Sequence, residues 1–563
     1  MIYHCEDHTC NYWDEGEKLP ERCPQCGRKL LRANEADMTG DDWTALGNTL
    51  WDAEASDKKR MVDCFRKAAY LGSAWGVCNL GICMEQGNGV EADPVQAFWL
   101  YQQAVEMGSL NAVCCLGVCY EYGIGTAPDA EKAAELYCKA AEYGSPRGQM
   151  LLAHAFHDGI GVEADAAEAV YWVRTAAYQR YGEGMHRLGV CYEYGDGVEQ
   201  NWERAVHWFR EAAESGVSAA MTDLGYCYEK GCGVEQSWEQ AFSWYRRGAE
   251  CGYPVSMSNL GLCYKRGYGV DQNWQEAVKW YEQGAQCGHL QSMNNLAYCY
   301  EYGEGVEQNE ERALYWYRRG AEAGSDYCMY CLGWNYSNGE GVEQNMTEAI
   351  RWYTAAAEGG NADAMHNLGW LYDHGEGVEQ DMKKAICWYE RAAEQNHPAA
   401  MNSLGECYAM GRGVPRDLET AMEWYRRAAE LGEAMADYNM GWHLEQAGKL
   451  SEAYAHYRKA ADGNDDSAWW ALGRFYENGV VVAQDGKEAR RCYETGEKLG
   501  SVKCKMRLAR CKLLGIGGRR AKNAGLDLCR QALELAKESS EKEDYGYEAE
   551  MNLLRRTIAE NES

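Results

Sequence analysis

A leucine that recurs at a spacing of 36 residues constrains the fold of this 563-residue chain more than any other feature. It begins a Leu-Gly or Leu-Ala pair in ten successive units, and Met440 continues the series. A strict period of this length predicts a stack of one supersecondary unit. Such stacks grow by adding units and present extended surfaces, so we expect recognition of a partner rather than catalysis. The leucines are Leu80, Leu116, Leu152, Leu188, Leu224, Leu260, Leu296, Leu332, Leu368 and Leu404.

Each unit predicts two helices joined by a loop that contains glycine. Leu260, Gly261 and Tyr264 fall at i, i+1 and i+4 and therefore lie on one stripe of a first helix. Gly267 then ends that helix, because glycine adopts the positive φ of a helix C-terminus without steric cost. A second helix starts after an Asp, Asn or Ser, the residue types that cap a helix N-terminus. These caps are Asp93, Asp129, Asp165, Asn201, Ser237, Asn273, Asn309, Asn345, Asp381 and Asp417.

The unit carries a family resemblance. Its pattern Ala-x-x-x-Leu-Gly-x-x-Tyr-x-x-Gly-x-Gly-Val, followed by Ala-x-x-Trp-Tyr-x-x-Ala-Ala, resembles the Sel1-like repeat, a longer-looped relative of the tetratricopeptide repeat. The match covers about residues 41–530. It implies an all-α, right-handed α-solenoid superhelix of about fourteen repeats, whose first helices run from Leu46 to Leu508, and a scaffold or adaptor that holds proteins. Residues 541–563 predict a polar C-terminal capping helix.

Four cysteines precede the repeats and predict a metal site. They are spaced Cys5-x4-Cys10-x12-Cys23-Pro-Gln-Cys26, and the second pair resembles the knuckle of a zinc ribbon. Four thiolates suit tetrahedral Zn²⁺ in a closed, structural site with no open position for catalysis. Residues 1–33 are too few to fold on an apolar core, so metal binding would supply most of the folding energy. His4 or His8 remains an alternative ligand, and a redox pair is the weaker interpretation.

The charge of the chain narrows the classes of partner. The formal net charge is −31 and the isoelectric point is about 4.9. This acidity opposes binding to nucleic acid or to an anionic membrane, and it favours a basic protein or peptide. The N-terminal residues lack the basic and apolar segments of a signal peptide, and no apolar run approaches the ~20 residues of a membrane helix. We therefore expect a cytoplasmic protein.

Cysteines at one repeat position allow two interpretations. The first is a small, buried, apolar position with reduced thiols. The second is a disulfide ladder, which the resemblance to the secreted, cysteine-rich branch of the family implies. In that branch, paired cysteines join the end of one repeat to the start of the next, but Cys251 and Cys287 have Asn259 and Asn295 at the expected partner positions. We expect buried thiols at Cys83, Cys119, Cys191, Cys227, Cys263, Cys299 and Cys407.

The opposite face of the first helices predicts a binding groove. In tetratricopeptide-like stacks this face is concave, and the residue after the Gly or Ala of the pair should point into it. Aromatic residues with a charged rim are typical of protein-binding hot spots. The alternative is that these rings pack between repeats, as we expect for Trp352 of a second helix. The predicted binding residues are the rings Tyr226, Tyr298, Trp334, Trp370 and Trp442, the rim Glu229, Glu301 and Asp373, and the neighbours Asn294, His366 and Asn402.

Three functions remain in view. The favoured one is an intracellular scaffold or adaptor without enzymatic activity, which grips a protein or peptide in the groove and uses the zinc ribbon as a second docking module. One alternative is a secreted-type cysteine-rich protein with small-molecule binding or hydrolase activity. The other is a nucleic-acid-associated zinc-ribbon factor. No catalytic residues are assigned, and the identity of the partner and the oligomeric state stay open.

Overall fold

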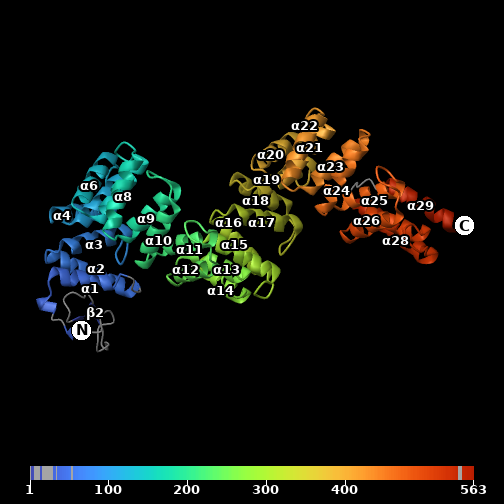
Figure 1. Ribbon diagram of the computed structural model, residues 1–563. Helices are drawn as coiled ribbons and strands as arrows, with labels where there is room; N and C mark the ends of the chain where they lie inside the picture. The colour runs from blue at the N-terminus through green and yellow to red at the C-terminus, as the bar shows by residue number, and fades with distance from the viewer. Residues whose placement is uncertain are drawn as a thin grey trace. The chain divides into compact units, whose positions relative to one another are not determined.

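A computed structural model of the chain describes residues 2–5, 13–15, 30–32, 35–51, 55–542 and 548–562. Over these residues, helices follow one another as fourteen first-and-second pairs, and a further helix, α29 (Glu548–Glu562), follows the last pair (Figure 1). The expected all-α solenoid of about fourteen repeats is confirmed. The chain forms two compact units, residues 1–292 and residues 293–563.

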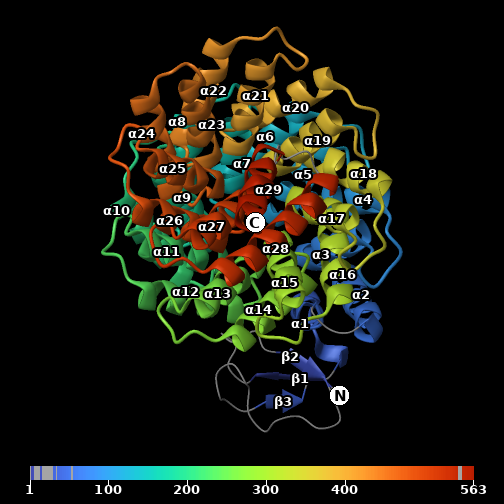
Figure 2. The same cartoon turned by 90° about the vertical axis from the view of Figure 1, so that its right-hand side faces the viewer.

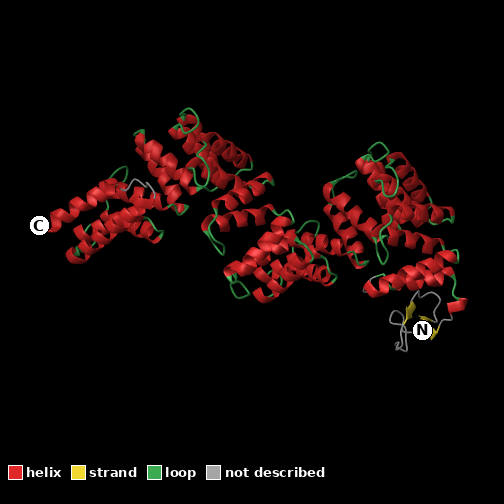
Figure 3. Cartoon of the chain, turned by 180° about the vertical axis from the view of Figure 1, so that it is seen from behind, coloured by secondary structure: helices red, strands yellow, loops and turns green. Residues whose placement is uncertain are grey.

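Most of the first and second helices have the same length and are joined by short loops (Figure 3). The first helices are α1 (Gly40–Thr49), α3 (Ala74–Gln86), α5 (Leu110–Tyr122), α7 (Pro146–Asp158), α9 (Gly182–Tyr194), α11 (Ser218–Lys230), α13 (Pro254–Arg266), α15 (Leu290–Tyr302), α17 (Asp326–Asn338), α19 (Ala362–His374), α21 (Pro398–Met410), α23 (Ala434–Gln446), α25 (Asp466–Asn478) and α27 (Val502–Leu514). The second helices are α2 (Ala55–Tyr70), α4 (Pro94–Glu106), α6 (Ala130–Glu142), α8 (Ala166–Tyr178), α10 (Trp202–Glu214), α12 (Trp238–Glu250), α14 (Trp274–Gln286), α16 (Glu310–Glu322), α18 (Met346–Glu358), α20 (Met382–Glu394), α22 (Leu418–Glu430), α24 (Leu450–Asp462), α26 (Gly486–Lys498) and α28 (Lys522–Lys542).

Three short strands precede the helices. β1 (Ile2–Cys5), β2 (Trp13–Glu15) and β3 (Leu30–Arg32) form an antiparallel sheet in the order β2-β1-β3 (Figure 2). A 3₁₀ turn at Glu35–Asp37 follows. The predicted zinc ligands Cys10, Cys23 and Cys26 lie outside the described residues, as do His8 and the side chains of His4 and Cys5.

The predicted helix boundaries rest on identifiable hydrogen bonds. The side chain of Asn273 accepts a hydrogen bond from the backbone N–H of Glu276, and Gly267 ends α13 with a φ of +73°. The other nine predicted caps accept the same kind of bond at the start of their helices, so the N-cap assignment is confirmed in all ten units. Each such bond satisfies a backbone donor that the helix itself leaves free.

The core of a typical repeat is an aromatic side chain of the second helix that packs directly against a glycine of the first helix. Tyr353 of α18 is buried, and a Cβ added to Gly333 would lie 2.5 Å from its ring. The neighbouring Trp352, which we expected in the core, is only half-buried and lies beside the guanidinium of Arg351. The expectation for Trp352 is therefore corrected, because the tyrosine of the Trp-Tyr pair fills the space between the helices.

The cysteine stripe is buried, as the first interpretation predicts. The seven cysteines of the stripe carry free thiols, and none of them is exposed. Burial raises the pKa of Cys83 to about 11 and that of Cys119 to about 12. Loss of solvation disfavours the thiolate, so these thiols are unreactive. Within the described part of the chain, no helix combines the length and the apolar character needed to cross a membrane.

Candidate functional site

Large aromatic side chains are exposed at one position of several first helices. In the unit of residues 1–292, Tyr226 of α11 is 43% exposed; in the unit of residues 293–563, Trp334, Trp370 and Trp442 are 44%, 38% and 38% exposed. Tyr298 of α15 occupies the same position and is half-buried. Other aromatic side chains of the chain are more exposed, such as Tyr70 at 91% and Trp99 at 64%; what distinguishes these rings is that they recur at one repeat position.

The ring contacts of these residues lie mainly within their own helices. Trp370 stacks on His374, one turn further along α19, with ring centroids 4.4 Å apart. Tyr298 contacts Tyr302 in the same way, with centroids 4.6 Å apart. These contacts lie along the helix surface, and part of each ring remains exposed.

Two of the acidic residues predicted to form a rim accept hydrogen bonds from buried tyrosines of their own repeats. Glu229 accepts a hydrogen bond of 2.9 Å from the hydroxyl of Tyr245, and Glu301 accepts one of 2.7 Å from Tyr317. Burial raises the pKa of Glu301. Each of these two glutamates therefore fixes the ring that its own repeat buries.

Asp373, at the same repeat position, is only 3% exposed. It forms an ion pair of 2.8 Å with Arg412, whose guanidinium also lies 3.8 Å from Glu406. The buried aspartate thereby ties α19 to the loop after α21. Asp373 is therefore buried against Arg412 and is not part of an exposed rim, whereas Glu229 and Glu301 are half-buried.

The predicted polar neighbours join successive first helices. Asn294 and Asn402 are only 7% and 6% exposed, and Asn402 accepts a hydrogen bond of 3.0 Å from Asn439 on the next first helix. His366 is half-buried between α19 and α21, where its Nε2 lies 3.4 Å from the hydroxyl of Ser403. Burial lowers the pKa of His366 to about 4, so the imidazole is neutral near pH 7.

Helix periodicity alone placed these polar residues on the open face, and it missed the contacts that bury them. A usable signal exists in the sequence. The hydrogen-bonded Tyr and Glu stand 16 residues apart in several repeats, as in Tyr137 with Glu121 and Tyr493 with Glu477. The rings, in contrast, are where the sequence placed them on the first helices.

Comparisons with known proteins agree with this architecture. The family described as Sel1 repeat matches twelve segments, at residues 76–109, 112–145, 146–181, 182–217, 218–253, 254–289, 290–325, 326–361, 362–397, 398–433, 434–465 and 468–501. A search of curated proteins found no match.

Many solved structures are similar to the chain, among them two that carry repeats of this kind. One is c5321, a protective antigen of uropathogenic Escherichia coli with an SLR fold; it is 29% identical, with 76% of this chain and 94% of that chain covered and a TM-score of 0.54. The other is a Sel1 repeat protein from Oxalobacter formigenes, 31% identical, with 43% of this chain and 96% of that chain covered and a TM-score of 0.39. With twelve repeats matched over most of its length, the chain belongs to the Sel1 repeat family.

Proposed function

We propose that this protein is a scaffold that binds a protein or peptide partner through the exposed rings of its first helices. The observation that carries the proposal is the recurrence of partly exposed tryptophan at one repeat position, in Trp334, Trp370 and Trp442. Tryptophan is the residue type most enriched among binding hot spots. Repeats present the rings on a scaffold of packed helices, so little conformational entropy is lost on binding.

Charge supports a basic partner. The chain carries a formal net charge of −31, which raises the local concentration of cationic partners. A lysine or arginine of a partner can lie over the exposed indole face of Trp370 or Trp442, where the cation is attracted by the ring.

Affinity capture tests this proposal. Full-length protein, used as bait in cell lysate, should retain a set of partners that mass spectrometry identifies, and the double variant Trp334→Ala with Trp370→Ala should lose them. The matched control is Tyr315→Ala, which removes a ring that is 51% exposed on the second helix α16. If the double variant still retains the partners and Tyr315→Ala loses them, the binding surface lies elsewhere.

The proposal includes two further elements that rest on the sequence. Cys5, Cys10, Cys23 and Cys26 would hold a structural Zn²⁺ in a small module that docks protein, since four thiolates in two pairs suit this metal. The cytoplasm would be the compartment, because the buried stripe cysteines are packed as free thiols.

A further inference from the structure

One repeat in the unit of residues 1–292 lacks the buried ring of its second helix. Val173 of α8 stands where the repeats on either side have Tyr137 and Phe209. Opposite it, the first helix carries Ala153 in place of the glycines that face those two rings, Gly117 and Gly189. The same position is aromatic in twelve other repeats: Phe65, Tyr101, Tyr137, Phe209, Tyr245, Tyr281, Tyr317, Tyr353, Tyr389, Tyr425, Tyr457 and Tyr493.

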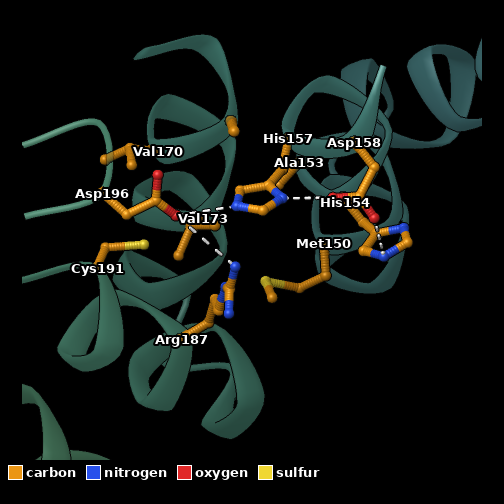
Figure 4. Close-up of a pocket in the computed structure, with 11 residues that line it drawn as sticks. Met150, Ala153, His154, His157, Asp158, Val170, Val173, Arg187, Cys191 and Asp196 are labelled. Carbon is orange, nitrogen blue, oxygen red and sulfur yellow. Dashed lines mark hydrogen bonds and ion pairs between the residues drawn. The ribbon is translucent and has the colours of Figure 1, made fainter. Parts of the chain in front are cut away.

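A cavity of about 410 Å³ lies where the ring is missing. Figure 4 shows that side chains of the first helix α7, the second helix α8 and the next first helix α9 surround it. This volume is within the range of about 300–1,000 Å³ that is typical of ligand pockets. The apolar walls are Met150, Ala153, Val170, Val173 and Cys191.

The polar end of the cavity is built around His157. Its Nδ1 lies 2.5 Å from a carboxylate oxygen of Asp158, and its Nε2 lies 3.2 Å from Asp196 (Figure 4). The guanidinium of Arg187 lies 3.8 Å from the same oxygen of Asp196. The side chains of His157, Asp158 and Asp196 are 41%, 43% and 32% exposed, so this end of the cavity opens to solvent.

The neighbouring repeat shows what kind of group such a space accepts. There, the hydroxyl of Tyr137 donates a hydrogen bond of 2.6 Å to Glu121. His157 stands 36 residues after Glu121, at the equivalent repeat position. His157 therefore stands where the neighbouring repeat has the carboxylate that accepts the hydrogen bond of the phenol hydroxyl.

We propose that this pocket binds the side chain of a tyrosine from a partner polypeptide. The ring would fill the apolar space between Ala153 and Val173, and the hydroxyl would hydrogen-bond at the His157, Asp158 and Asp196 cluster. We infer a tyrosine residue of a polypeptide, and not a free small molecule, because in most other repeats the equivalent space is filled by a tyrosine side chain of the second helix. The site is separate from Trp334 and Trp370, so its test and the test of the scaffold proposal succeed or fail independently.

Ligand-observed NMR with the full chain tests the pocket, using N-acetyltyrosinamide as the probe. Saturation transfer from the wild type to the phenol protons is the expected result. The double variant Ala153→Gly with Val173→Tyr restores the pair found in neighbouring repeats and should abolish the transfer while the melting temperature is maintained or raised. Absence of transfer with the wild type, or unchanged transfer with a folded double variant, would overturn the proposal.

A second variant keeps the test decisive if the double variant does not fold. His157→Leu should weaken the binding of N-acetyltyrosinamide by about tenfold and change the affinity for N-acetylphenylalaninamide by less than about twofold. Only the phenol of the first probe uses the hydrogen bond. The matched control is His207→Leu, which removes an exposed histidine of α10 and should change neither probe. Equal effects of His157→Leu on both probes, or binding of p-cresol without N-acetyltyrosinamide, would contradict a tyrosine residue as the occupant.

Discussion

Tyr137 of α6 lies directly on Gly117 of α5, so that a Cβ added to Gly117 would stand 2.5 Å from Cε1 of the tyrosine ring. The hydroxyl of the same ring reaches Glu121, one turn further along α5. A single side chain therefore fills the space between the two helices and fixes their register. This relationship explains why a small residue follows the leucine in the repeats: glycine leaves room for the ring, and Ala297, opposite the buried Tyr317, is the largest residue at this position that faces a buried ring.

Gly117→Ala should destabilise the protein although alanine favours helices. Forcing a methyl group into a packed core costs about 1–3 kcal/mol, more than the ~1 kcal/mol that alanine gains over glycine in a helix. Tyr137→Val alone should cost ~2–5 kcal/mol by leaving a cavity. The double variant should lose less free energy of unfolding than the sum of the two single losses, because valine leaves room for the added methyl group. Thermal unfolding followed by circular dichroism checks this, and strict additivity would contradict the contact.

The period of the sequence predicted the fold for a physical reason. Caps such as Asn273 and C-terminal glycines such as Gly267 act within a few residues, so their effect is readable locally. The first helices and their partners then follow from the spacing alone. The buried member of the Trp-Tyr pair was not readable, because Trp352 and Tyr353 are adjacent and either ring could turn toward the core.

The candidate site was predictable only in part. Trp334 and Trp370 are exposed on the first helices, as their position predicts. Asp373 is buried because Arg412, from a loop 39 residues away, pairs with it. The cavity beside Val173 depends on a missing ring, and the sequence shows the substitution without showing whether neighbours close the space. Contacts between repeats are set by packing, which a single helix period does not encode.

Metal analysis of the purified protein should give one zinc per chain. Cys23→Ser should lose the metal while the helical circular dichroism spectrum persists, because the repeats fold on their own contacts. Cys251→Ser, which removes an exposed cysteine of the repeats, is the control and should retain the zinc. A metal-free wild type, or loss of the helices on chelation, would reject an independent zinc module.

Thiol labelling should separate the cysteines by burial. Cys251, Cys287 and Cys387 are exposed, so iodoacetamide should modify them first under native conditions. Cys227 and Cys263 are buried, and burial raises the pKa of each to about 12, so they should react only after unfolding. Mass spectrometry of peptides gives the order. Native disulfides among the stripe cysteines would instead support the secreted, cysteine-rich alternative.

His366 should make stability depend on pH. Burial, with a contribution from His397, lowers its pKa to about 4 in the folded protein, whereas an unfolded histidine has a pKa of about 6.5. Between these values the unfolded chain binds a proton that the folded chain does not, so stability falls as the pH decreases through this window. The loss attributable to His366 is about 2 kcal/mol at pH 5. His366→Asn should therefore show a smaller drop in melting temperature between pH 7 and pH 5 than the wild type, and equal drops would contradict a buried neutral imidazole.

The contrast between exposed and buried rings tests the binding face most directly. Trp334→Ala and Trp370→Ala should each weaken partner capture by about 1–3 kcal/mol, with little change in melting temperature, because these rings are partly exposed in the free protein. Tyr353→Ala should do the reverse, since removing a buried ring costs ~3–5 kcal/mol of stability. Melting temperature and capture are measured on the same preparations. If Trp334→Ala destabilises the repeats as much as Tyr353→Ala, the exposed rings serve packing, and the partner binds at another surface.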